Sequence, residues 1–482
     1  MYAQLLKSLE EFILPNWQSA VGAVVALVAG ITMLRQRRRQ SNIFAWIFFI
    51  LVFPLIGTFA FLTFGGRKHR RIAETKRDIN RLAGILSEDD SDGNDGDDTP
   101  APRSAAPPAP LGGNSVKLLD DPDGTAMWHA LCAEIAAARR TIHITTYLLG
   151  HGEVGRAVIR LLAARAREGV HVRLLADAVG SLSMRWGLCR PLIEAGGQVR
   201  RFMPVFPFGP LSRRGSANLR NHRKIAVFDG CRAIIGGQNL STDYTGPTRN
   251  PKRFRDFSVL IQGPAVAGLT RIFLSDWCFA SGESPELYKE QLRYDPPPAG
   301  EVRVEIVSGG PDVPGDPLWE HFVTQIQEAR RKITIITPYL VPDEVLFRVL
   351  LAKVRAGRKV RLILPKRSDH PFLDLARRPY LRTLHKAGAE IMLYEKSMLH
   401  GKLFLIDSST AVVGSANLDM RSLFVNFEAA AFIYSPSAVR PFRKLVHELQ
   451  KDCVSYAASP LVRLDWKNRI LESLAHLIGP LL

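Results

Sequence analysis

Two stretches of the sequence carry the same set of residues that could do chemistry. Residues 221–240 (NHRKIAVFDGCRAIIGGQNL) and 399–418 (LHGKLFLIDSSTAVVGSANL) both read His-x-Lys-x4-Asp-x6-Gly-[Gly/Ser]-x-Asn, starting from His222 and His400. Together they supply two imidazoles, two ammonium groups and two carboxamides. This set suits phosphate diester chemistry, because Lys and Asn can hold anionic oxygens while one imidazole attacks phosphorus and the other protonates the leaving alkoxide.

Each motif is framed by apolar, partly β-branched residues, with Asp-Gly or Asp-Ser between the two apolar runs. This pattern predicts two buried strands joined by a tight turn. Residues two apart on a strand point to the same face of the sheet. We therefore expect Lys224 to lie beside His222, and Lys402 beside His400.

The remaining motif residues are of two kinds. Asn239 and Asn417 follow the return strand, where a hairpin brings them back toward the His, and we expect them to bind phosphoryl oxygens. Asp229 and Asp407 lie an odd number of residues after the His, at the predicted turn, so their default direction is away from it. This spacing favours a role in bracing the turn or a neighbouring cation.

Two alternatives compete with this interpretation. Paired His could bind a metal ion, but each stands two residues from a cationic Lys, and no Cys or second His lies at ligand spacing. A single His-x-Lys pair also arises by chance on many strands, yet here every spacing from His to Asn is kept in both copies. We therefore expect neither a metal ion nor another cofactor.

The chain also repeats itself at the scale of a domain. Residues 130–149 (ALCAEIAAARRTIHITTYLL) resemble residues 322–341 (FVTQIQEARRKITIITPYLV), and further matched segments lead in each half to the His motif. The shared order of helix, strand, helix, strand and hairpin predicts an α/β fold of two similar halves, with mixed sheets flanked by helices. Halves related by a pseudo-twofold axis would bring His222 and His400 into one cleft.

The repeat identifies a carboxylate at one matched position in each half. When Pro264 is aligned with Pro436, Asp256 falls opposite Glu428. A carboxylate that accepts a hydrogen bond from one imidazole nitrogen fixes the tautomer and aims the other nitrogen at phosphorus. The alternative is a surface carboxylate paired with an Arg, which competes most strongly at Asp256, since Arg255 precedes it.

Two other features could line the cleft. Tyr147 and Tyr339 end matched strands, although Tyr at such a position is more often packed in the core. The segment MPVFPFGPL (203–211) precedes the first motif, and its apolar side chains make it a candidate contact for acyl chains.

Both motifs resemble those of the phospholipase D superfamily, whose pattern is HxKxxxxD, and HGKLFLIDSSTAVVGSANLDMRSLFVNFE is similar to bacterial cardiolipin synthases. The resemblance covers nearly the whole chain except residues 87–110. Gly237 stands where the superfamily pattern has Ser, which argues against a hydroxyl contact to phosphate from the first half. The family motif groups Asp229 and Asp407 with the catalytic residues, and its Asn-x-Glu continuation supports Glu428.

The resemblance implies a membrane-bound phosphatidyltransferase that condenses two phosphatidylglycerol molecules into cardiolipin and releases glycerol. His222 would attack the donor lipid to form a phosphatidyl-histidine, and His400 would act as acid and then base, while the near symmetry leaves the reverse assignment open. Phosphatidylethanolamine stays open as the acceptor. A phospholipase D-type hydrolase would use the same motifs, because water can replace the alcohol.

Two further classes of function are less favoured. A phosphodiesterase acting on nucleic acid would use the same motifs and suit the net charge of +18, but two membrane spans argue against it, so we expect no nucleic acid partner. A non-catalytic scaffold that binds anionic lipid would not need an intact His and Lys in both halves. We therefore expect anionic membrane lipid to be both the surface and the substrate.

Two uncharged apolar runs, residues 17–34 and 43–64, each approach the ~20 residues that a helix needs to span a bilayer. They predict a transmembrane hairpin around the basic run RQRRR (35–39). A longer basic run follows the second span, so we expect the catalytic region to be cytoplasmic, at the inner membrane of a bacterial cell. Five scattered Cys, none at close spacing, agree with a reducing compartment.

These segments divide the 482-residue chain into four parts. A membrane anchor of an amphipathic helix and the two spans occupies residues 1–72, and a disordered acidic and Pro-rich linker occupies residues 73–115. The two phospholipase D-like halves cover residues 116–295 and 296–482. The second ends in an amphipathic helix (461–482) that would dock on the membrane, on its own domain, or on a second copy in a homo-oligomer.

Overall fold

The computed structural model describes residues 70–84, 109–182, 186–204, 218–459 and 472, together with six positions between 46 and 57. The predicted membrane spans, the C-terminal helix and most of the linker therefore lie outside the described residues, apart from single positions. Among the described helices, none combines the length and apolar character needed to cross a bilayer. Contacts divide the chain into residues 1–67 with 204–219 and residues 68–203 with 220–482, and all elements below belong to the second unit.

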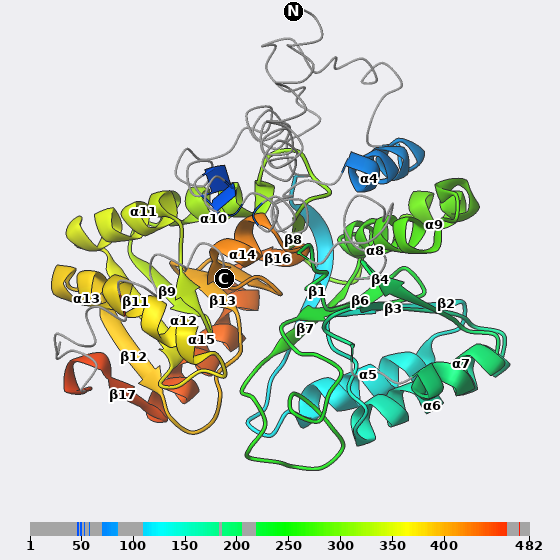
Figure 1. Ribbon diagram of the computed structural model, residues 1–482, viewed down its shortest axis with the longest axis horizontal. Coiled ribbons are helices and arrows are strands. Elements are labelled where there is room, and N and C mark those ends of the chain that lie inside the picture. The colour runs from blue at the N-terminus through cyan, green and yellow to red at the C-terminus, as the bar shows by residue number, and fades with distance from the viewer. Residues whose placement is uncertain are drawn as a thin grey trace, which may run out of the picture. The chain divides into compact units, whose positions relative to one another are not determined.

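The first half is a mixed sheet with helices on both faces (Figure 1). In chain order its elements are β1 (Leu111–Leu119), α5 (Thr125–Ala137), β2 (Thr141–Thr146), α6 (Glu153–Arg167), β3 (His171–Asp177), α7 (Arg190–Glu194), β4 (Gln198–Phe202), β5 (Ile225–Phe228), β6 (Arg232–Gly236), β7 (Ser258–Gln262), α8 (Val266–Ser281) and α9 (Lys289–Arg293). Helices α5, α6 and α7 cover one face of the strands, and α8 packs on the other.

The second half repeats this order with short additions. Its elements are β8 (Val302–Gly309), α10 (Pro317–Glu328), β9 (Lys332–Ile336), β10 (Leu340–Val341), α11 (Glu344–Arg355), β11 (Lys359–Pro365), α12 (Pro371–Ala376), α13 (Arg378–Ala387), β12 (Glu390–Tyr394), β13 (Leu403–Ile406), β14 (Thr410–Gly414), β15 (Leu418–Asp419), α14 (Met420–Phe424), β16 (Glu428–Tyr434), α15 (Pro436–Lys451) and β17 (Cys453–Ser455). The additions are β10, α12, β15, α14 and β17.

The strand order confirms the predicted pair of similar α/β halves. In the described residues, one sheet runs β17-β12-β11-β9-β13-β14-β16-β8-β1-β7-β6-β5-β2-β3-β4. Read outward from the antiparallel pair β1 and β8, the two halves give the same sequence of equivalent strands. Each half pairs three strands in parallel and the others antiparallel, as a mixed sheet requires.

The predicted linker is too long at both ends. Residues 73–82 belong to helix α4 (Arg70–Leu82), and strand β1 begins at Leu111, within the range assigned to disorder. Ile72 and Ile79 lie seven residues apart on one face of α4 and are fully buried. This apolar pair fixes the helix on the folded halves, so acidic and Pro-rich composition marks only the middle of the predicted linker.

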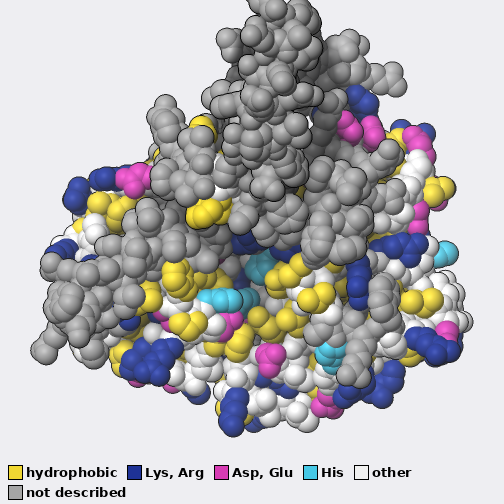
Figure 2. All heavy atoms as spheres, in the orientation of Figure 1, with side chains coloured by type: hydrophobic (Ala, Val, Ile, Leu, Met, Phe, Trp, Pro, Cys, Tyr) yellow, Lys and Arg dark blue, Asp and Glu magenta, His cyan; other side chains and the backbone are white. Residues whose placement is uncertain are grey.

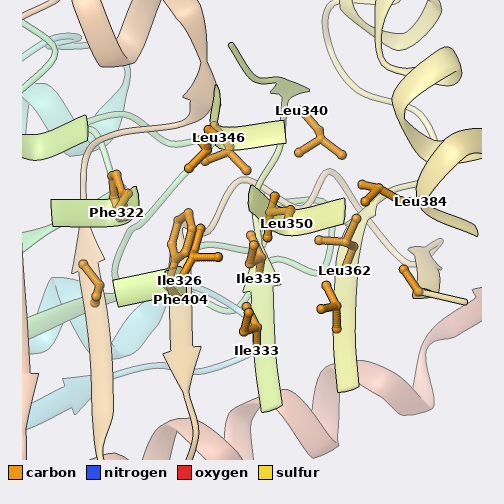
Figure 3. Close-up of a cluster of buried hydrophobic side chains, with 14 of the residues drawn as sticks. Phe322, Ile326, Ile333, Ile335, Leu340, Leu346, Leu350, Leu362, Leu384 and Phe404 are labelled. Atoms are coloured by element: carbon orange, nitrogen blue, oxygen red, sulfur yellow. The ribbon is translucent and has the colours of Figure 1, made fainter. Parts of the chain in front are cut away.

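The three largest apolar cores of the described residues stabilise the two halves. One core fills each half beneath its own helices, and Figure 3 shows the second-half core, where side chains of α10 and α11 meet those of β9 and β11. The third core contains residues of β5, β6 and β7 together with residues of β13, β14 and β16, sealed by α8 and α15. Because this core crosses the boundary between the halves, groups on opposite halves keep a fixed separation.

Candidate active site

The two motif His are placed by a reciprocal exchange of backbone hydrogen bonds. The amide of His222 donates to the carbonyl of Phe427 (2.9 Å), just before Glu428 in the other half. The amide of His400 donates to the carbonyl of Arg255 (2.8 Å), just before Asp256. Each half therefore positions the His of the other through the segment that leads into its own carboxylate.

The side chains follow the same exchange. Nδ1 of His222 lies 2.9 Å from Oε1 of Glu428, and Nδ1 of His400 lies 2.6 Å from Oδ2 of Asp256. Both carboxylates are buried. A carboxylate that accepts a hydrogen bond from Nδ1–H leaves the lone pair on Nε2, which is then the nitrogen presented for chemistry.

Each Lys lies beside its own His, as the strand spacing predicts. Lys224 Nζ donates to the backbone carbonyl of His222 (2.7 Å), and Lys402 Nζ donates to that of His400 (2.6 Å). Lys402 Nζ also lies 2.8 Å from Nδ1 and 3.0 Å from Nε2 of the His400 ring, so it stands against the ring as a whole. Histidine side chains gather near the middle of the face shown in Figure 2.

The charged groups of the two halves share one electrostatic environment. Burial is the main cause that lowers the pKa of His222 and of His400, the latter to about 4. Burial also lowers the pKa of Lys402 to about 8, and that of Lys224 well below its usual range. The Lys of the opposite half lowers the pKa of each imidazole further. Both imidazoles are neutral at pH 7 in this state, which is the form that a nucleophile needs.

The structure does not bring Asp229 and Asp407 to the imidazoles. Asp229 accepts hydrogen bonds from the backbone N–H groups of residues 139–141 (2.7 to 3.1 Å), and Asp407 from those of residues 330–332 (2.8 to 3.0 Å). Both Asp have a positive φ, of 52° and 55°, at the hairpin turn. This corrects their grouping with the catalytic residues: they tie each hairpin to the neighbouring strand, as the odd spacing from the His favours.

We expect Asp229→Ala to lower the free energy of unfolding by about 1–3 kcal/mol, because backbone N–H groups lose their acceptor and Ala is strained at positive φ. The kcat of the folded fraction should stay within about threefold of wild type. Denaturation in detergent and kcat per folded molecule give the two numbers. Asp229→Asn, which keeps an acceptor oxygen and tolerates this φ, serves as the control. A catalytic role would instead lower kcat steeply in both variants at unchanged stability.

The two Asn differ in their surroundings. Asn239 Oδ1 accepts a hydrogen bond from the amide of Leu148 (3.2 Å), and its side chain is also hydrogen-bonded to Tyr244. Asn417 is buried, and among the described residues its Oδ1 has no hydrogen-bond partner. The side chain of Asn417 is also hydrogen-bonded to Asp419, so only its acceptor oxygen lacks a partner in the described part of the chain. An unpaired acceptor is costly in a finished core, which is consistent with a donor, such as a hydroxyl, that arrives with substrate.

The Ser of the superfamily pattern has a different role from the expected phosphate contact. Ser415 Oγ donates to the carboxylate of Glu428 and also accepts from the amide of Ala429 (3.1 Å). At the equivalent Gly237, an added Cβ would lie 2.4 Å from Oδ1 of Asp256. The hydroxyl therefore helps to hold one carboxylate, and the other carboxylate occupies the space that a Ser would need.

Aromatic rings stand against both imidazoles, and the sequence located only one of them. Tyr147 lies edge-on to His222 with ring centroids 5.1 Å apart, and Tyr244 does the same to His400 at 5.1 Å. Tyr339, the matched partner of Tyr147, instead donates to Asp369 (2.6 Å). The comparison of the two halves does not single out Tyr244, because the segment that follows the second motif has no Tyr at the matching position.

Within the described ranges, no three His, Cys, Asp or Glu side chains converge closely enough to hold a metal ion. The Nδ1 atoms of both motif His are already engaged by carboxylates. The engaged Nδ1 atoms leave nucleophilic attack and proton transfer to Nε2, beside two Lys side chains, and this set suits substitution at an anionic phosphorus.

Comparison with known proteins identifies the family. A family model described as "Cardiolipin synthase, PLD-like domain" matches residues 131–277 and 322–450. A cardiolipin synthase of Geobacillus kaustophilus (strain HTA426) is 32% identical over 477 residues, covering 93% of this chain and 90% of that protein. The chain belongs to the cardiolipin synthase family of phospholipase D-like proteins. The resemblance drawn from the two motifs is thereby confirmed.

Three further matches concern the whole chain, its N-terminal part and its fold. The major cardiolipin synthase ClsA of Bacillus subtilis (strain 168) is 32% identical over 482 residues, covering 95% of this chain and 97% of that protein. A model of the phospholipase D-nuclease N-terminal family matches residues 23–66. The crystal structure of phosphatidylserine synthase from Haemophilus influenzae Rd KW20 shares the fold, with a TM-score of 0.59 at 14% identity over 85% of this chain and all of that chain.

Proposed function

We propose that the protein is a phosphatidyltransferase that joins two phosphatidylglycerol molecules into cardiolipin and releases glycerol. Membership of the cardiolipin synthase family supports this activity. The observation that carries the mechanism is the exchange of carboxylates, in which Glu428 and Asp256 engage the Nδ1 atoms and leave the Nε2 side of each imidazole for chemistry, beside two buried Lys.

In the first step, Nε2 of His222 attacks the phosphorus of the donor lipid. The new P–N bond gives a phosphatidyl-histidine, and the P–O bond to glycerol breaks. His400 supplies the proton that the departing alkoxide takes up. The bound anionic diester favours protonation of His400, because an adjacent negative charge raises the pKa of an imidazole.

In the second step, the terminal hydroxyl of a second phosphatidylglycerol takes the place of the released glycerol. His400, now neutral, removes the hydroxyl proton while the oxygen attacks phosphorus, and the P–N bond to His222 breaks. Lys224 and Lys402 balance the charge that builds on the phosphoryl oxygens, and Asn239 and Asn417 donate hydrogen bonds to them.

We also propose that the protein is a multi-pass protein of the bacterial inner membrane, with spans at residues 17–34 and 43–64 and a cytoplasmic catalytic region. The match of residues 23–66 to the phospholipase D-nuclease N-terminal family supports an association with the membrane. Placing the cleft at the bilayer concentrates the second lipid and limits the access of water, which favours transfer over hydrolysis. Anionic lipid is the partner that this arrangement requires.

The test is a product analysis. Purified full-length protein is incubated in mixed micelles with phosphatidylglycerol carrying a labelled head-group glycerol and a labelled acyl chain. We expect cardiolipin and free glycerol in equal amounts. Phosphatidic acid in place of cardiolipin would make the protein a hydrolase, and no turnover of either kind would contradict an enzymatic role.

A further inference from the structure

A buried group of charges lies directly under the first-half His. Arg223, the residue between His222 and Lys224, is fully buried. Its Nη1 lies 2.6 Å from Oδ1 of Asp276 on α8, and its Nη2 lies 3.0 Å from Oδ2 of Asp312, which follows β8. The guanidinium is thus held between a carboxylate of the first half and a carboxylate of the second.

The same buried charges hold the residues on either side of His222 and the backbone of Glu428. Asn221 donates through Nδ2 to Oδ2 of Asp276 (2.8 Å) and accepts through Oδ1 from the amide of Arg223 (3.1 Å). Arg223 Nε donates to the backbone carbonyl of Glu428 (3.1 Å). The residues before and after His222, and the backbone of its carboxylate partner, are all bound to one charge network.

Helix α4 completes this network. Lys76 Nζ lies 2.8 Å from Oδ2 of Asp312 and 2.9 Å from Oγ of Ser308. Its side chain is 13% exposed, and α4 packs against α8. Two cations, Arg223 and Lys76, then balance two carboxylates, Asp276 and Asp312. Without Lys76, one negative charge would stay uncompensated in a region from which water is excluded.

The second half has no equivalent of this network among the described residues. Gly401 stands at the position of Arg223, and a Cβ there would lie 2.3 Å from the ring of Phe257. An apolar ring therefore underlies His400, whereas charges underlie His222. The two imidazoles of a nearly symmetric site are made different at this point.

We propose that Lys76 is a positioning residue for His222, acting through Asp312 and Arg223. Lys76 belongs to helix α4, which follows the segment matched by the N-terminal family model at residues 23–66. Packing of α4 on the two halves therefore determines how His222 is held for the reaction. The inference rests on the proposed reaction for its kinetic consequence. Its structural consequence, a change in the surroundings of one imidazole only, does not depend on which product forms.

The test compares Lys76→Met with Arg77→Met in the full-length protein. Both remove one cation from the same turn of α4, but Arg77 is exposed and stands outside the network. We expect Lys76→Met to lower kcat about tenfold to a hundredfold with KM for phosphatidylglycerol within about twofold, and Arg77→Met to leave both unchanged. The double variant with Asp312→Asn restores neutrality and should recover most of the lost kcat, which a purely structural role of Lys76 would not allow.

A second readout is the pKa of His222, measured by NMR on histidine-labelled protein. His222 faces Glu428, Lys224, Lys402 and the ring of Tyr147, which stay in place in every variant. The uncompensated Asp312 in Lys76→Met favours the imidazolium, so the pKa of His222 should rise and the acid limb of the kcat profile should move to higher pH, by about half a unit. An unchanged His222 pKa and pH profile, or a loss of kcat that Asp312→Asn only deepens, would overturn the proposal. If the wild type forms phosphatidic acid or no product, the proposed reaction fails, while the pKa comparison still decides the role of Lys76.

Discussion

His222→Ala and His400→Ala should each lower kcat for cardiolipin formation by about 10⁴-fold, since each removes a group that reacts in both steps of the proposed mechanism. The two variants fail at different points. Without His222 no P–N bond can form, whereas without His400 the nucleophile is intact and only the proton for the leaving alkoxide is missing. A donor whose leaving group needs no proton separates these cases.

A phosphatidyl ester of p-nitrophenol provides that donor. With it, His400→Ala should release about one equivalent of nitrophenolate in a burst and accumulate an acid-labile phosphohistidine, because attack by His222 no longer needs an acid. His222→Ala should show no burst. The control is His129→Ala, which removes an exposed His of α5 and should behave as wild type. A burst from His222→Ala instead would exchange the two roles, and a burst from neither variant would rule out the covalent intermediate.

Glu428→Gln should lower kcat about 10³-fold, with a much smaller change in KM, although the side chain keeps its shape. The carboxylate accepts from Nδ1 of His222 and from the hydroxyl of Ser415. An amide can offer only its oxygen as acceptor, so the His222 ring loses its fixed tautomer, and Nε2 no longer carries the lone pair reliably. Kinetics in mixed micelles at saturating phosphatidylglycerol measure the effect.

The matched control is Glu305→Gln. Glu305 is also a buried second-half carboxylate bonded to a His, at 2.8 Å from Nε2 of His321, but it lies on β8 away from the motifs. Its replacement removes the same charge and should affect stability while leaving kcat per folded molecule within about threefold. If Glu428→Gln kept more than a tenth of the wild-type kcat, the carboxylate would not be what orients the nucleophile.

The exchange of carboxylates makes the two halves dependent on each other for chemistry. Each half owns a His, a Lys and a carboxylate, yet its His is oriented by the carboxylate of the other half. The shared core of β5, β6, β7, β13, β14 and β16 keeps these pairs at hydrogen-bond distance. A change that separated the halves would therefore deprive both imidazoles of the carboxylates that orient them.

Short-range patterns in the sequence determined the local parts of the site. Alternation along a strand placed Lys224 beside His222 and Lys402 beside His400, and the odd spacing turned Asp229 away. The repeat of helices and strands gave the two similar α/β halves, and its alignment found Asp256 and Glu428. These inferences held because neighbouring residues fix each other's direction through backbone geometry, whatever the rest of the chain does.

Only the tertiary structure decided which groups meet across the boundary between the halves. The repeat showed that Asp256 and Glu428 are equivalent, but not that each serves the His of the opposite half. Tyr244, Arg223 and the contact of Lys76 with Asp312, 236 residues away, were likewise invisible to pattern. Such contacts depend on how elements distant in the sequence pack together. The periodicity of apolar residues predicts single helices and strands, but not which residues they contact elsewhere in the chain.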